Sequence, residues 1–206
     1  MKLTLPRALL ILAALAAAVA GFYVARQIDR TSPQLASGTW FPQGWQVADF
    51  RLTDSAARPF TLSRLSGSPT LLFFGFTHCP DVCPTTLVKL ARVRSAAGIA
   101  DLKVLFVSID PQRDTPEVLA RYVHAFDPQF EGVTGEPQAI EALARRFNVA
   151  VNRVELPGGD YTMDHSAVVF LLNAQARVVA IFTPPFDEKL MAADLRSSAP
   201  YLEGRR

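Results

Sequence analysis

The 206-residue sequence contains only two cysteines, Cys79 and Cys83, and both lie in one short stretch, FGFTHCPDVCP. A domain of about 150 residues buries enough apolar surface to fold without covalent cross-links. Two cysteines are also fewer than the four thiolates that iron–sulfur clusters commonly use. The pair therefore indicates a functional site rather than a structural staple.

An excess of one sign of charge is also missing. The sequence has 21 Lys and Arg against 19 Asp and Glu, a net charge of +2, and no long basic run. Proteins that bind nucleic acid need clustered basic residues, so no nucleic acid partner is expected. Internal repeats and low-complexity tracts are absent as well, which indicates one globular domain plus a further segment.

That further segment is the N-terminus, where residues 8–25 form an uncharged, mostly apolar run. Eighteen such residues are just enough for a helix that spans a bilayer, so we expect a single transmembrane anchor with residues 1–7 in the cytoplasm. A cleaved signal peptide is the alternative, because Ala18-Val19-Ala20 offers a cleavage site.

In either case the rest of the chain is exported. For a bacterium, this places the C-terminal domain in the oxidising periplasm, and the anchor predicts a single-pass protein of the inner membrane. Residues 26–45 are rich in Ser, Pro and Gly and are expected to be a linker, followed by the folded domain over 46–206.

Apolar patterns along the domain predict its fold class. Continuous apolar runs at 70–76 and 101–109 indicate buried strands, and residues 149–156 are compatible with another strand. Helical spacing follows the cysteine loop and recurs over 116–126, 136–147 and 187–196, and Thr115-Pro116 is a typical helix start. Residues 47–65 and 167–182 read as β-hairpins. This order predicts an α/β, thioredoxin-like fold with an N-terminal β-hairpin, preceded by a single transmembrane helix.

The cysteine loop lies between a buried strand and a helix start, where the helix dipole favours thiolates. Cys79 and Cys83 are separated by three residues, one more than in a Cys-x-x-Cys redox motif. The wider spacing still allows a disulfide, but it also lets both sulfurs converge on one ion. Two thiolates favour Cu(I), zinc or iron–sulfur chemistry.

A third ligand would come from the histidines, of which there are only three. His78 neighbours Cys79 on extended chain and is expected to point away, and His124 falls within an amphipathic helix. His165 precedes the apolar run AVVFLL, and in a thioredoxin-like fold the loop before that strand lies against the cysteine loop. His165 is therefore the candidate ligand.

Acidic residues near these motifs have supporting roles at most. Asp81 and Asp164 are the nearest acids, and they are candidates for an electrostatic bias on the site or for a hydrogen bond to His165. The alternative for each is an aspartate that caps a loop or a turn. The turn DPQRDT, which contains Asp110, Arg113 and Asp114, reads as a structural Asp–Arg network. No ligand is expected there.

Three motifs in this order, GFTHCPDVCP, VSIDPQRDTP and DHSA, resemble those of the Sco/SenC family over about residues 50–201. The resemblance implies a membrane-anchored, thioredoxin-like metallochaperone that delivers copper to the binuclear site of cytochrome c oxidase subunit II. It places the copper ligands at Cys79, Cys83 and His165. Other periplasmic copper chaperones are further candidate partners. One departure is Ala56-Ala57, where members of the family often carry glycine.

Several alternatives to copper delivery stay open at this stage. The two thiols could form a redox-active disulfide and reduce the copper-ligand cysteines of subunit II, which would make the protein a thiol–disulfide oxidoreductase. Against this as the sole role stand the spacing and the residues Asp164-His165-Ser166, where thioredoxins place a cis-proline. A purely structural disulfide would leave the DHS motif unexplained. The Pro-x-x-x-Thr-x-x-Cys motif of peroxiredoxins is absent.

Overall fold

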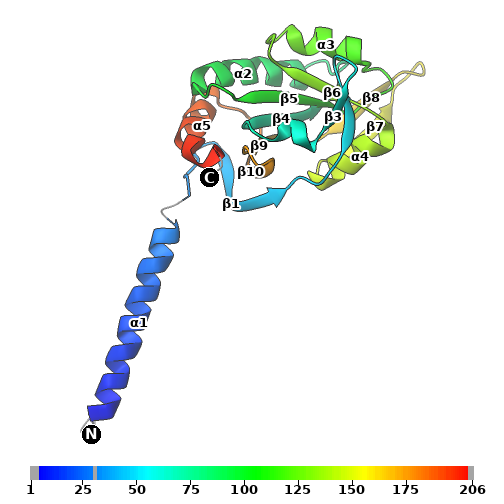
Figure 1. Ribbon diagram of the computed structural model, residues 1–206. Helices are drawn as coiled ribbons and strands as arrows, with labels where there is room; N and C mark the ends of the chain where they lie inside the picture. Colours follow the sequence, from blue (N-terminus) through cyan, green and yellow to red (C-terminus); the bar gives the residue numbers. More distant parts are fainter. Residues whose placement is uncertain (1–4, 30–31, 204–206) are drawn as a thin grey trace. The chain divides into compact units, whose positions relative to one another are not determined.

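The computed structural model describes residues 5–29 and 32–203, and the chain divides into two compact units, Met1–Gln34 and Leu35–Arg206 (Figure 1). The first unit contains one helix, α1 (Leu5–Asp29), which covers the expected anchor at 8–25. Contrary to that expectation, none of the helices in the described residues is both long and apolar enough to cross a membrane. The predicted cytoplasmic segment, residues 1–7, falls largely outside the described residues.

The second unit is built on an eight-stranded sheet with the order β1-β10-β9-β4-β5-β6-β2-β3. Its central strand β4 is the apolar run TLLFFG, and all six of its residues are buried, as the sequence predicts. β4 and β5 are parallel, and so are β5 and β6, whereas β4 and β9 are antiparallel. The strands are β1 (Gly38–Gln46), β2 (Arg51–Asp54), β3 (Pro59–Thr61), β4 (Thr70–Gly75), β5 (Lys103–Ser108), β6 (Glu131–Thr134), β9 (Val169–Leu172) and β10 (Arg177–Phe182).

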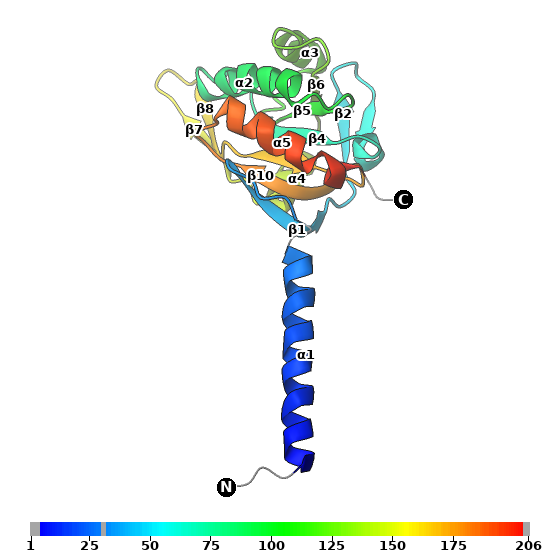
Figure 2. The ribbon, with the colours of Figure 1, turned by 90° about the vertical axis from the view of Figure 1, so that its left-hand side faces the viewer.

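Helices cover both faces of this sheet, which makes the α/β prediction correct. The helices are α2 (Val82–Ala97), α3 (Pro116–His124), α4 (Pro137–Arg146) and α5 (Glu188–Leu202), and a 3₁₀ helix, η1 (Leu62–Leu65), follows β3. Figure 1 shows α2 and α3 on one side of the sheet and α4 on the other, and Figure 2 shows α5 beside α2. Thr115 caps α3 by accepting a hydrogen bond from the backbone of Val118, with Pro116 at the first helical position, as expected.

The predicted N-terminal hairpin is present as β2 and β3, which pair antiparallel at the far edge of the sheet. Buried Asp54 holds its turn by accepting hydrogen bonds from the backbone N–H groups of Ala56 and Arg58. Ala57 in this turn has φ +58°, in the left-handed region that favours glycine. The sequence therefore has alanine at a position where glycine would be less strained.

Three strands differ from the sequence-based expectations. Residues 38–46 were expected to belong to a linker but form β1, which pairs with β10. β6 falls where the sequence predicts no element. The stretch before AVVFLL was expected to be a loop but contains β8 (Tyr161–His165), which pairs only with β7 (Val151–Glu155) in a separate two-stranded sheet. Each is stabilised by pairing rather than by its own apolar pattern, so a local pattern does not reveal it.

Candidate metal and thiol site

The two cysteines lie at the connection between strand β4 and helix α2. Cys79 is in the loop and partly exposed, whereas Cys83 is completely buried. The sequence predicts Cys83 just before the helix, but the structure places it as the second helical residue. Both cysteines are free thiols, so the redox-active disulfide stays a prediction.

The position of Cys83 makes Cys79 the thiolate of the pair. The backbone N–H of Cys83 donates a hydrogen bond to Cys79 Sγ at 3.3 Å. A hydrogen bond from the Cys83 thiol, aided by this backbone donor and opposed by burial, lowers the pKa of Cys79 to about 5. The same thiol–thiolate hydrogen bond, together with burial, raises the pKa of Cys83 far above its ordinary value. The site therefore holds one partly exposed thiolate and one buried thiol at neutral pH.

His165 reaches the same place from the end of strand β8. Its Nε2 lies 3.6 Å from Cys83 Sγ, and its Nδ1 lies 3.2 Å from the carbonyl oxygen of Ser166. Nδ1–H donates to that carbonyl, which leaves the lone pair on Nε2, the form in which imidazole binds metals. Burial lowers the pKa of His165 and keeps the ring neutral.

Aromatic rings enclose this imidazole. The rings of Phe73 and Phe76 meet it edge-on, with centroids 6.0 and 6.1 Å away. They pack against the His165 side chain, which is left only partly exposed to water. Cys83 Sγ thus lies between the Cys79 thiolate and the His165 lone pair.

The three candidate ligands have the chemistry, although not yet the arrangement, of a copper site. Within residues 5–29 and 32–203 no three His, Cys, Asp or Glu side chains are already grouped to hold a metal ion. Cys79 and His165 contact Cys83 from two directions and have room to converge, because Cys79 lies on a partly exposed loop. Two thiolates and a neutral imidazole suit Cu(I) and Cu(II) well.

The other sequence candidates lie apart from this centre. His78 is exposed, with its Nδ1 3.1 Å from the Thr77 hydroxyl, and His124 is exposed at the end of α3. The side chains of Asp81 and Asp164 are exposed, and the proposed hydrogen bond to His165 is made instead by the Ser166 carbonyl. These differences arise because backbone groups, which a sequence motif does not reveal, compete for the imidazole N–H.

The turn DPQRDT forms the structural network that the sequence predicts, with an ion pair between Asp110 and Arg113. It also contacts the start of the cysteine loop. Buried Asp114 accepts hydrogen bonds from the Thr77 hydroxyl at 2.6 Å, the Thr77 backbone N–H and the Ser108 hydroxyl at 2.6 Å. Burial raises the pKa of Asp114 despite these bonds. Through Thr77, Asp114 anchors the start of the loop that carries Cys79.

Gly75 is a site residue that the sequence interpretation missed. A Cβ at this position would lie 2.9 Å from Cys83 Sγ and 2.7 Å from the Phe106 ring. Contacts this short are not tolerated, so only glycine lets β4 approach the buried thiol. A glycine inside an apolar strand is the signal that could have identified it.

Gly75→Ala is expected to reduce the free energy of unfolding by about 1–3 kcal/mol, the usual cost of overpacking a core. Gly132→Ala is the matched control, because Gly132 is also buried in a strand but its added Cβ would meet nothing closer than 3.3 Å. Urea denaturation of both variants measures the difference. Equal losses in the two would show that the contact with Cys83 does not restrict position 75.

Comparison with known proteins places this arrangement among related chains. A model of the SCO1/SenC family matches residues 43–199. Protein SCO1 homolog 1, mitochondrial, of Arabidopsis thaliana is 37% identical over 137 residues, which are 65% of this chain and 41% of that protein. The chain therefore matches less than half the length of this relative.

Two solved structures resemble the folded unit closely. ScoI of Arabidopsis thaliana with copper bound has a TM-score of 0.71 and 34% identity, and the match covers 75% of this chain and 98% of that one. ScoI of Bradyrhizobium japonicum with copper bound has a TM-score of 0.67 and 40% identity, with coverages of 73% and 98%. These neighbours confirm the mixed α/β, thioredoxin-like fold.

Proposed function

Because the chain belongs to the SCO1/SenC family, we propose that it binds one copper ion through Cys79, Cys83 and His165 and delivers it to the binuclear site of cytochrome c oxidase subunit II. One observation carries this proposal: a partly exposed thiolate, a buried thiol and a neutral imidazole lone pair meet around Cys83. Copper is the cargo here, and the two solved relatives with copper bound support this choice of metal.

Each ligand has a distinct part in loading and release. Cys79 is the point of entry, because its sulfur is accessible and already ionised. Cys83 must lose its proton to bind the metal, so copper binding releases a proton and weakens at low pH. On release, the exposed Cys79 sulfur is the ligand that a partner's thiolate can replace first.

The test is a copper titration of the full chain against competing chelators. We expect the reduced protein to bind one Cu(I) or one Cu(II), and the protein with a Cys79–Cys83 disulfide to bind neither. His165→Ala is expected to raise the Kd for Cu(II) at least about tenfold, the loss typical even of residues that only support a ligand. Cu(I) should be affected less, because two sulfurs satisfy it.

His124→Ala is the control for this variant, because His124 is exposed at the end of α3. If the reduced wild-type chain retains no copper, the proposal is wrong. Transfer is tested by mixing the loaded chain with reduced, copper-free subunit II and following the metal to the acceptor.

A thiol–disulfide oxidoreductase is the second candidate, and the unequal thiols favour it. The Cys79 thiolate would attack a disulfide of subunit II, forming a mixed disulfide and releasing one partner thiolate. Cys83, after losing its proton, would attack Cys79 Sγ and release the second partner thiol. The partner gains two electrons, and the chain ends as the Cys79–Cys83 disulfide. Fast reduction of oxidised subunit II by a chain that holds no copper would favour this function. The periplasmic location stays a prediction, whether the protein delivers copper or reduces thiols.

A further inference from the structure

The β7–β8 hairpin that carries His165 is held apart from the main sheet. Its two strands pair only with each other, from Val151 opposite His165 to Glu155 opposite Tyr161. At its base, the Ser166 N–H donates to the Ala150 carbonyl at 3.3 Å. No ladder of hydrogen bonds from the eight-stranded sheet therefore sets the position of this hairpin.

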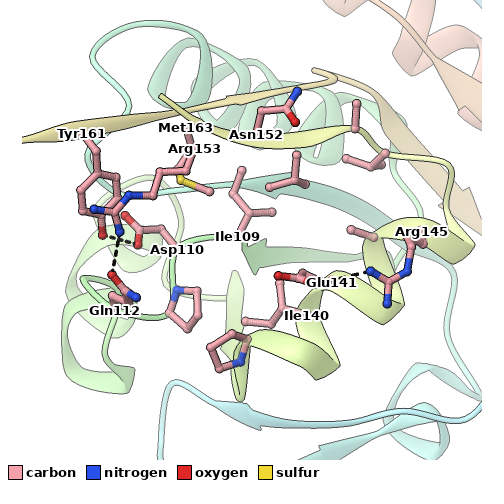
Figure 3. A pocket seen from close by; sticks show the side chains of 16 residues that line it. Ile109, Asp110, Gln112, Ile140, Glu141, Arg145, Asn152, Arg153, Tyr161 and Met163 are labelled. Carbon is pink, nitrogen blue, oxygen red and sulfur yellow. Dashed lines mark hydrogen bonds and ion pairs between the residues drawn. The ribbon is translucent and has the colours of Figure 1, made fainter. Parts of the chain in front are cut away.

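Core packing fills only part of the space beneath the hairpin. A pocket of about 610 Å³ lies between the hairpin, helix α4 and the turn after β5 (Figure 3). Its lining includes Met163 and Val151 from the hairpin and Ile140 and Ile109 from the domain. The inner face of the hairpin thus borders this cavity along part of its length, and Val151 and Met163 from the hairpin pack against the edge of the core.

A polar clamp around Tyr161, whose members Asp110 and Arg153 also line this pocket, ties the hairpin to the domain. The Tyr161 hydroxyl donates to the carboxylate of buried Asp110 at 2.8 Å, a bond that Figure 3 shows. Arg113 donates to the same carboxylate at 2.5 Å and to the Tyr161 backbone carbonyl at 2.9 Å. The Tyr161 ring lies between two guanidinium groups, with Arg113 Cζ 3.7 Å and Arg153 Cζ 3.6 Å from its centroid.

The clamp also contacts β7, the other strand of the hairpin. Arg153, which stacks on the Tyr161 ring from β7, donates to the side-chain oxygen of Gln112 at 3.1 Å. Asp110, Gln112 and Arg113 all belong to the turn DPQRDT, which ends in Asp114, the anchor of the cysteine loop. One short turn thus contacts both the thiol loop and the histidine hairpin.

We propose that Tyr161 is a positioning residue that, clamped by Asp110 and Arg113, holds the β7–β8 hairpin so that His165 Nε2 faces Cys83. Tyr161, Met163 and His165 occupy every second position of β8, so their side chains point to the same face of the strand. A shift of Tyr161 away from the turn therefore moves the imidazole of His165 with it. The clamp therefore controls how strongly the third ligand takes part in copper binding. This inference rests on the proposed function for its metal-dependent consequences.

The test compares Tyr161→Phe, which loses the hydroxyl but keeps the stacked ring, with Tyr161→Leu, which loses both. Tyr161→Leu is expected to raise the Kd for Cu(II) more than about tenfold, because it loses the stacked ring in addition to a hydrogen bond to a charged group, while the Kd for Cu(I) changes less than about threefold. Tyr161→Phe should have a smaller effect in the same direction. Electron paramagnetic resonance should show weaker nitrogen coupling from imidazole in the leucine variant.

Val154→Ala is the matched control, because Val154 lies on the same hairpin but is 43% exposed and outside the clamp. The double variant Tyr161→Leu/His165→Ala identifies the route of the effect. If Tyr161 acts through His165, the double variant should bind Cu(II) as His165→Ala alone does. Additive losses, equal weakening of Cu(I) and Cu(II), or an unchanged Cu(II) signal would each overturn the proposal.

A measurement without metal separates this inference from the proposed function. Hydrogen exchange of the metal-free full chain should be about tenfold faster in the β7–β8 amides of Tyr161→Leu than in the wild type, with β4 and β5 unchanged. Unchanged exchange in the hairpin would overturn the clamp even if copper binds. If wild type binds no copper but the exchange result holds, the proposed function fails and the clamp remains.

Discussion

Serine in place of Cys79 or Cys83 is expected to weaken Cu(I) binding by about 100- to 1,000-fold. The scale comes from four-ligand zinc sites, where a binding free energy of ~10–16 kcal/mol implies several kcal/mol for each ligand. Cu(I) requires soft sulfur ligands, and a serine hydroxyl is a poor substitute. The loss should be similar for the two positions, although Cys79 is partly exposed and Cys83 is buried. Competition with a Cu(I)-specific chelator at fixed pH measures the affinity.

Cys83→Ser also buries a hydroxyl beside Phe106 and the His165 ring, so a second variant is needed. Cys83→Ala introduces no polar group and leaves only a small cavity. Both variants of position 83 should fold, as judged by circular dichroism, and both should lose copper. Wild-type affinity in Cys79→Ser would contradict a two-thiolate site and would point to ligands other than those proposed.

Cys79 is expected to react with iodoacetamide at least about a hundredfold faster than Cys83 at pH 7, because a thiolate with pKa about 5 is almost fully ionised there. Cys83 is buried and its pKa is raised, so it stays protonated and shielded. The rate at Cys79 should stay level from pH 9 down to about pH 6 and fall as the pH drops through about 5. Mass spectrometry of the labelled, metal-free protein reports both sites.

Cys83→Ala supplies the control for this pH profile. The thiol of Cys83 is the largest cause of the lowered pKa of Cys79, so its removal should move the midpoint of the Cys79 profile upward. Comparable labelling of the two cysteines in the wild type, or an ordinary thiol midpoint for Cys79, would show that the two thiols are not differentiated. The order of attack in the oxidoreductase scheme would then lose its basis.

Much of the fold was predictable because its signals are local. The apolar run of β4 and the cap formed by Thr115 and Pro116 involve residues that are neighbours in the sequence, and the structure confirms both. β1 was not predictable in the same way. It pairs with β10, whose residues lie more than a hundred positions further along the chain, and it lies in a stretch rich in Ser, Pro and Gly.

The candidate site likewise has features that the sequence predicts and features that only the fold reveals. Residue type and spacing identified Cys79, Cys83 and His165, because few other soft ligands exist in the sequence. Of the roles left open for Asp81 and Asp164, the hydrogen bond to His165 is not made, since the Ser166 carbonyl accepts from Nδ1–H. Asp81 instead accepts a hydrogen bond from the Thr85 hydroxyl, as a loop-cap aspartate would. Backbone carbonyls are present at every position, so only the chain's path shows which of them is near a side chain.

The sequence by itself therefore determined the family, the α/β class and the identity of the three candidate ligands, since these depend on residue type and on short-range order. Only the tertiary structure decided that Cys79 is the thiolate and Cys83 the buried thiol, because that difference comes from burial and from a hydrogen bond between them. It also decided that Tyr161 meets Asp110 across 51 positions of the chain. Such contacts arise when folding brings distant segments together, and their free energies depend on distances that a sequence does not contain.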